Sequence, residues 1–252
     1  MTRIAILHPG QMGAAVGRAL VEAGHDVGWL PDGRGAGTRR RAEEAGLTAL
    51  DDVADRDLVV SVCPPAAAVD TARSVAGFPG IYLDANAVSP RTASEVAAVV
   101  AGSYVDGGIV GPPPVQAGST RLFLSGARAD EVAVVFAGSR LEPVVLDGDT
   151  AASALKMTYA AWTKITAALL VSLRGAAREL GVEDALVAEW ARSQPELTAR
   201  YAGALAAARD KGWRWEEEMR QVARTFSAAG EPAGFGEAAA ELFARWPRPA
   251  DL

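Results

Sequence analysis

Short apolar runs alternate with helical patterns along the first part of the chain, and glycine turns separate them. Uncharged runs of this length fit strands that are buried on both faces of a parallel sheet. We expect strands at residues 4–7, 27–30, 58–63, 81–84, 104–110, 120–125 and 144–146. Strands that alternate with helices in this way predict an α/β fold with a doubly wound Rossmann domain.

From Thr150 to Leu180 the pattern changes to a long apolar helix. Apolar side chains recur there at steps of three and four, and Gly181 follows as a stop signal. Such a rod would be about 45 Å long, so it should join two domains or pack in a dimer. Only helical patterns follow, at residues 184–192, 196–209, 216–228 and 236–244, with breaks expected at Gly212 and Gly230.

These patterns predict two domains: an N-terminal Rossmann domain, residues 1–148, and an all-α domain, residues 149–252. The two are joined by the long helix.

Composition excludes several classes of protein. The chain has 252 residues, half of them hydrophobic, and a net charge of −6 without a long basic run, which argues against nucleic-acid binding. A single cysteine and two histidines exclude an internal disulfide and argue against a metal site. We find neither a signal peptide nor an uncharged stretch long enough for a membrane, so we expect a cytoplasmic protein.

A glycine turn follows the first strand. It reads His8-Pro9-Gly10-Gln11-Met12-Gly13 and leads into a helix and a second strand, which is the order of a dinucleotide-binding unit. His8 stands where the first glycine of GxGxxG belongs, so the fingerprint is imperfect, and an ordinary strand–turn–helix is the alternative. Gly10 would let the backbone approach a pyrophosphate, and Gly13 would let helix and strand pack closely. The expected cofactor-binding residues here are Gly10, Gln11, Met12 and Gly13.

A basic loop follows the second strand. An acidic residue at this position would bind the ribose of NAD, but the strand ends at Leu30 and Pro31. The arginines that follow suit the 2′-phosphate of NADP, because guanidinium groups pair with phosphate in a forked geometry. We therefore favour NADP(H) over NAD(H), although Asp32 keeps NAD open and a solvated helix start is the alternative. The expected contacts are Arg34, Thr38 and Arg39.

Two further strand ends should lie at the cofactor edge of the sheet. One carries Cys63, Pro64 and Pro65, and the other leads to Asn86. Cys63 is interpreted as a small buried residue, because no histidine is placed to activate it. Asn86 would either bond to the nicotinamide ribose or cap the helix that starts near Ser89.

Two lysines interrupt the apolar helix. Lys156 and Lys164 are the only charges between Ala151 and Ser172. Each stem could pack on apolar surface while its ammonium reaches water. The alternative is an ammonium in a cleft that gives or takes a proton. The first reading is favoured for Lys164 and the second for Lys156.

The chain resembles the β-hydroxyacid and 6-phosphogluconate dehydrogenase superfamily, which includes imine reductases. The resemblance rests on residues 8–13, on Cys63-Pro64-Pro65, on residues 84–90 and 106–112, and on Lys156 in the long helix. Residues 211–219 resemble a segment found in a short subgroup of this superfamily, whose C-terminal domain has no assigned role. The resemblance implies that residues 1–148 form an NAD(P)-binding Rossmann domain and residues 149–252 a helical domain for substrate binding and dimerisation. It also implies an interdomain helix that joins them and often an intertwined homodimer. It also implies that Lys156 is the catalytic lysine.

Two departures from the family pattern concern the substrate. The family's substrate-carboxylate motif has Val110 in place of its serine and Pro112 in place of its last glycine, and the asparagine four residues after the lysine is Ala160. These departures argue against a simple 3-hydroxy acid as the substrate, while hydride chemistry is unaffected. Tyr159, one turn from Lys156, would supply a replacement donor.

The first hypothesis is an NADPH-dependent oxidoreductase acting on a small carbonyl or hydroxy compound. Lys156 would exchange the proton, and Tyr159 or Asn86 would orient the substrate. The alternatives are imine reduction on the same scaffold, with Tyr159 as donor, and a non-catalytic NADP-binding sensor.

Overall fold

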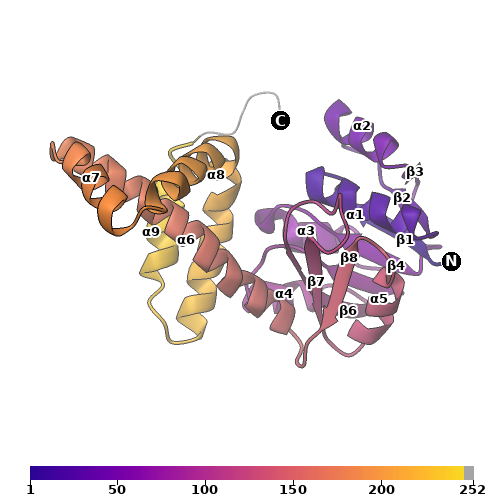
Figure 1. Ribbon diagram of the computed structural model, residues 1–252. Coiled ribbons are helices and arrows are strands. Elements are labelled where there is room, and N and C mark those ends of the chain that lie inside the picture. The colour runs from indigo at the N-terminus through magenta and orange to yellow at the C-terminus, as the bar shows by residue number, and fades with distance from the viewer. Residues whose placement is uncertain (247–252) are drawn as a thin grey trace. The chain divides into compact units, whose positions relative to one another are not determined.

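The computed structural model describes residues 1–246 (Figure 1). It divides into two compact units, the first Met1–Met157 and the second beginning at Thr158. The division falls inside the long helix, shortly after the boundary predicted at residue 148. Residues 247–252 of the predicted second domain lie outside the described part of the chain.

The first unit is built on an eight-stranded sheet with the order β3-β2-β1-β4-β5-β6-β7-β8. All neighbouring strands are parallel except β6 and β7, which run antiparallel. The strands are β1 (Arg3–Leu7), β2 (Asp26–Trp29), β3 (Thr48–Ala49), β4 (Leu58–Ser61), β5 (Ile81–Asp84), β6 (Ser103–Val110), β7 (Thr120–Ser125) and β8 (Leu141–Val145). All seven predicted strands are present, so the fold class is confirmed.

Helices cover both faces of this sheet, as Figure 1 shows. One buried cluster joins the strands to α1 (Gln11–Glu22), α2 (Ala36–Glu44) and α5 (Ala129–Phe136). The other joins them to α3 (Ala68–Arg73), which follows the short 3₁₀ helix η1 (Pro65–Ala67), and to α4 (Pro90–Ala97). Strands buried on both sides explain why their sequences read as unbroken apolar runs.

The long helix, α6, runs from Ala151 to Glu179 and is shared by the two units. Gly181 ends it in the left-handed conformation, at φ +71°. The amides of Gly181 and Val182 donate to the carbonyls of Arg178 and Ala177, at 3.1 and 2.9 Å. This is the glycine stop expected from the sequence.

The second unit continues as helices, with one correction to the prediction. They are α7 (Glu183–Ser193), α8 (Leu197–Ala228) and α9 (Gly234–Phe243). The break expected at Gly212 is wrong, because α8 runs through it. A Cβ at Gly212 would lie 3.3 Å from the Trp246 ring, so glycine here makes room for a tryptophan instead of ending a helix.

Lys164 lies inside the second unit. Its Nζ is 2.9 Å from Oε1 of Glu218, and the two side chains are only 14% and 11% exposed. The ammonium also lies over the ring of Trp215, 5.6 Å from its centroid. The interpretation that this ammonium reaches water is therefore wrong, and a largely buried ion pair accounts for the charge in the apolar helix.

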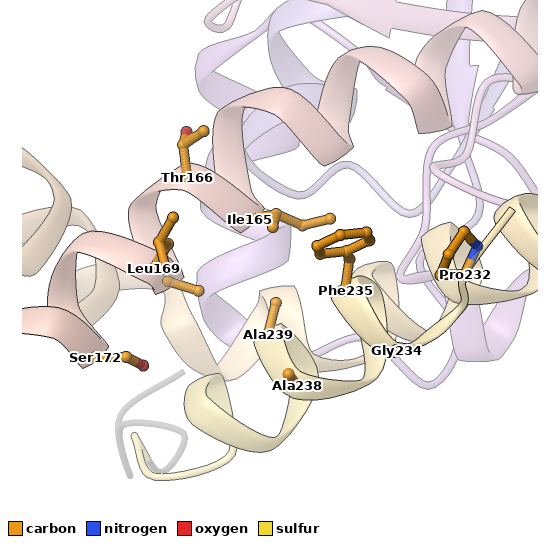
Figure 2. A pocket seen from close by; sticks show the side chains of 10 residues that line it. Ile165, Thr166, Leu169, Ser172, Pro232, Gly234, Phe235, Ala238 and Ala239 are labelled. Atoms are coloured by element: carbon orange, nitrogen blue, oxygen red, sulfur yellow. The ribbon is translucent and has the colours of Figure 1, made fainter. Parts of the chain in front are cut away.

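Helices α6 and α9 also enclose an apolar pocket of about 600 Å³ (Figure 2). Its lining residues are Ile165, Thr166, Ala168, Leu169, Ser172, Pro232, Gly234, Phe235, Ala238 and Ala239. Phe235 and Leu169 are among the large hydrophobic side chains that stay exposed, at 58% and 54%.

Candidate functional site

The turn between β1 and α1 has the compact form expected of a dinucleotide-binding turn. The amide of Gly10 donates to the carbonyl of His8 at 2.7 Å, and Gly10 is the N-cap of α1. A Cβ at Gly13 would lie 2.5 Å from the His8 carbonyl oxygen, whereas a Cβ at Gly10 would meet nothing within 4 Å. Gly13 is thus required for packing, and Gly10 faces open space at the start of a helix, where backbone amides can bind phosphate.

The basic loop between β2 and α2 is fastened by two arginines of α2. Arg39 donates to the carbonyls of Arg34 at 3.1 Å and of Pro31 at 2.9 Å. Arg41 donates to Thr38 Oγ1 at 3.0 Å and to the carbonyl of Pro9 at 3.4 Å, which ties the loop to the glycine turn. Of the three residues predicted to contact a 2′-phosphate, Thr38 and Arg39 therefore also hold the loop's shape.

Arg34 is close enough to the glycine turn to act on His8 electrostatically. Burial lowers the pKa of His8 to about 4, and the positive charge of Arg34 contributes to this shift. His8 is therefore neutral at pH 7. The Nε of Arg34 and the Nδ1 of His8 are both buried without a hydrogen-bond partner among the described residues.

Asn86 links the ends of β4 and β5. Its Oδ1 accepts from the amide of Cys63 at 2.5 Å, and its Nδ2 donates to Ser61 Oγ at 3.0 Å. The side chain is only 2% exposed. The suggestion that Asn86 caps the next helix is wrong, because Ser89 is the N-cap of α4 and accepts from the amide of Thr92.

The other residues predicted at these strand ends are Cys63, Pro64 and Pro65. Cys63 is buried, and burial raises the pKa of its thiol, which suits the interpretation as a small packed residue. Pro64 is exposed, and Pro65 begins η1. Asp84, at the end of β5, is 1% exposed, and burial raises its pKa to about 7.

Asp106, in the middle of β6, anchors the start of α6. It accepts hydrogen bonds from Ser125 Oγ at 2.9 Å and from the amide and hydroxyl of Ser153 at 2.8 and 2.5 Å. Ser125 in turn accepts from the amide of Ala152 at 3.1 Å. The first turn of α6, with four amides that lack partners in the helix, is thus fastened to the sheet by one buried carboxylate.

Lys156 follows this anchor by one turn and lies against β6. A Cβ at Gly108 would be 2.7 Å from the Ala152 carbonyl oxygen and 3.0 Å from Lys156 Cβ. Because Gly108 has no side chain, the helical turn of α6 that carries Lys156 can pack directly against β6. Tyr159, the second residue predicted for catalysis, is 49% exposed and lies one turn further along the same helix.

Sequence reasoning missed the Asp106 anchor, and it noted His8 only as a departure from the glycine fingerprint. A buried aspartate inside an apolar strand was a usable signal for Asp106, because a buried carboxylate needs hydrogen-bond donors. Nothing in the local sequence identified Ser125 and Ser153 as those donors, since they lie 19 and 47 residues away.

Among residues 1–246, no helix is both long and apolar enough to span a membrane. Over the same residues, no group of three or more His, Cys, Asp or Glu side chains is arranged to hold a metal ion.

The strand order 3-2-1-4-5-6, with a glycine turn at the end of β1, defines the class of dinucleotide-binding α/β domains. Residues 177–246 match a family model described as a domain of unknown function, DUF1932. An uncharacterized 28.5 kDa protein from Methanothermus fervidus is 29% identical over 161 residues, which are 62% of this chain and 63% of that protein. The matched region thus covers less than two thirds of this relative.

Solved structures extend the match to nearly the whole chain. A conserved protein of unknown function, described as structurally similar to 3-hydroxyacid dehydrogenases, is 25% identical with a TM-score of 0.71 over 96% of both chains. The 3-hydroxyisobutyrate dehydrogenase of Mycobacterium tuberculosis is 20% identical with a TM-score of 0.71, covering 97% of this chain and 93% of that one. An imine reductase from Streptomyces aurantiacus is 20% identical with a TM-score of 0.52, covering 96% and 93%.

The resemblance to the β-hydroxyacid dehydrogenase superfamily is therefore confirmed at the level of the fold. Other structures with this fold hold NADP⁺ or NADPH.

Proposed function

We propose that the chain is an NADP(H)-dependent oxidoreductase that moves hydride between the nicotinamide and a small carbonyl or hydroxy compound. One observation carries the proposal. Lys156 is fixed against β6 by the Asp106 anchor, in the same compact unit whose sheet edge bears the glycine turn. A dinucleotide turn and a fixed amine on one domain are the two parts that such a reaction needs.

The residues at the sheet edge fit a phosphate-bearing cofactor. The backbone from Gly10 to Gly13, with Gln11 and Met12 in the first turn of α1, would hold the pyrophosphate, because Gly10 faces open space. Arg34 would meet the 2′-phosphate, and its unpaired Nε supports this role. Thr38 and Arg39 would act mainly by holding the loop, while Cys63, Pro64 and Pro65 would border the site.

The chain's own chemistry is proton transfer and orientation. The bound nicotinamide supplies or accepts the hydride. In the reductive direction Lys156 donates a proton to the oxygen of the carbonyl as negative charge develops there, which completes the hydroxyl group. Tyr159 orients the substrate from the next turn, and Asn86 keeps the ends of β4 and β5 in register beside the cofactor.

Imine reduction is the second candidate, because an imine reductase shares the fold. A lysine ammonium beside an iminium would be repulsive, so in this case Tyr159 would donate the proton. The two candidates differ in which side chain is essential.

The test is NADPH oxidation against a panel of ketones, keto acids and cyclic imines. With a carbonyl substrate, Lys156→Ala should lower kcat by at least about a hundredfold and Tyr159→Phe by less, since general-acid catalysis contributes about 10²–10⁴-fold. NADPH binding should persist in both variants. Lys211→Ala is the matched control, because Lys211 is an exposed lysine of the second unit, and it should keep full activity.

Activity of Lys156→Ala equal to that of the wild type would overturn the proposed role of the lysine. A loss confined to Tyr159→Phe, on cyclic imines only, would favour imine reduction instead.

A homodimer is part of the proposal. Several exposed apolar side chains of the second unit lie on α6 and α9, among them Leu169, Leu173 and Phe235. A second copy that covers them would remove this apolar surface from water.

A further inference from the structure

His8 occupies a position where its backbone is strained. Among the described residues it is the only non-glycine with positive φ, at +65°. Such a conformation costs energy for a side-chain-bearing residue, and residues that keep it are concentrated at functional sites. Glycine would relieve the strain, and it is the residue that the dinucleotide fingerprint carries at this position.

The His8 side chain and Arg34 leave two buried nitrogens unsatisfied. His8 Nδ1 and Arg34 Nε have no hydrogen-bond partner, although both atoms are shielded from solvent. Buried polar atoms are nearly always paired, so an unpaired pair of this kind indicates a group that is brought by a ligand. Both nitrogens can carry a hydrogen, and one of them belongs to a cation, so the missing group is an acceptor with negative charge.

We infer that His8 and Arg34 together bind the 2′-phosphate of NADP(H), which makes His8 a specificity-determining residue. The inference rests on the proposed function and goes beyond it, since it assigns a role to the residue that breaks the glycine fingerprint. His8 is neutral at pH 7 because its pKa lies near 4, so in its Nδ1-protonated form it donates one hydrogen bond to the phosphate.

Arg34 gives the reason for choosing the 2′-phosphate over the pyrophosphate. It lies in the loop after β2, at the position that distinguishes NADP from NAD in this class of fold. Its backbone is held there, because its amide donates to the Pro31 carbonyl at 3.2 Å and its own carbonyl accepts from Arg39 at 3.1 Å. A histidine that shares a ligand with this arginine therefore contacts the phosphate on the ribose.

The experiment measures dissociation constants of NADPH and NADH, by calorimetry or cofactor fluorescence, together with the melting temperature. The variants are His8→Gly, His8→Asn and Arg34→Gln. His8→Gly should weaken NADPH binding by about tenfold or more, as expected for a hydrogen bond to a charged group, and leave NADH binding unchanged. Its melting temperature should equal or exceed that of the wild type, because the backbone strain is released.

His8→Asn is the matched control for the backbone. Asparagine tolerates the left-handed conformation but lacks the imidazole, so it should lose NADPH affinity like His8→Gly. The double variant, His8→Gly with Arg34→Gln, should lose less NADPH affinity than the product of the two single fold-losses. The reason is that the two residues share one phosphate.

Equal losses for NADPH and NADH would place His8 at the pyrophosphate and overturn the inference. Unchanged affinity for both cofactors, with a lower melting temperature, would make His8 purely structural and overturn it as well. In either case cofactor binding by the wild type would leave the proposed function standing. A wild-type protein that binds neither cofactor would overturn both.

Discussion

Replacing Gly108 by alanine tests whether the close packing of Lys156 against β6 matters for catalysis. The new Cβ would lie 2.7 Å from the Ala152 carbonyl oxygen and 3.0 Å from Lys156 Cβ, while ordinary contacts begin at 3.4 Å. The first turn of α6 would have to move by roughly 0.7 Å, the difference between 3.4 and 2.7 Å. Overpacking of this kind costs about 1–3 kcal/mol of unfolding free energy.

A shift of that size should also lower catalysis. Misplacement of a reacting group by about 1 Å can cost about a hundredfold in rate, so we expect kcat to fall by about ten- to a hundredfold. The assay is NADPH oxidation with the best substrate from the panel, beside chemical denaturation to measure the loss of stability. NADPH affinity should be unchanged, because the glycine turn and the basic loop are not touched.

Gly107→Ala is the matched control for this variant. Its Cβ would also be crowded, at 2.9 Å from Leu83 Cδ1 and 3.0 Å from the Asp84 carbonyl oxygen, but those atoms belong to β5 and not to α6. It should lose stability and keep kcat. The reasoning is refuted if Gly108→Ala keeps wild-type kcat, or if Gly107→Ala loses as much of it.

Two further predictions concern Asp84 and Phe235. Because burial raises the pKa of Asp84 from 3.8 to about 7, the folded state binds a proton more tightly than the unfolded state, and this contribution to stability is lost as pH rises from about 4 to about 7. Asp84→Asn should therefore gain stability relative to the wild type over that range in denaturant titrations, and a constant difference would contradict the assignment. Phe235→Asp should convert the proposed dimer to monomer in sedimentation experiments, whereas Val134→Asp, at an even more exposed valine of the first unit, should not. A wild-type monomer, or a Phe235→Asp dimer, would argue against the dimer.

The sequence was sufficient for the strands of the sheet, because strands buried on both faces leave unbroken apolar runs. It was not sufficient for β3, whose two residues are both exposed and give no apolar run. Gly212 misled the prediction because a glycine that ends a helix and a glycine that admits a neighbouring ring look identical in sequence. Only the contact with Trp246 distinguishes them.

The candidate site shows the same limit. The glycine turn could be predicted because it depends on local spacing, whereas the catalytic role of Lys156 comes from the family resemblance and stays a prediction. The hydrogen-bond partners of Lys164 and Arg39 could not be predicted. The local sequence around a charged side chain does not indicate which oxygen atom elsewhere in the fold will accept its hydrogen bond. Lys164 meets Glu218, which lies 54 residues away, and Arg39 meets two carbonyls of the loop that precedes its helix.

The fastened loop after β2 has a consequence for how cofactor choice can change during evolution. Its shape is maintained by Arg39 and Arg41 through backbone carbonyls, which any residue at position 34 would also offer. Exchange of the side chain at 34 would then alter what the loop recognises without remodelling the loop itself. A lineage carrying this scaffold could pass between the two nicotinamide cofactors by single codon changes.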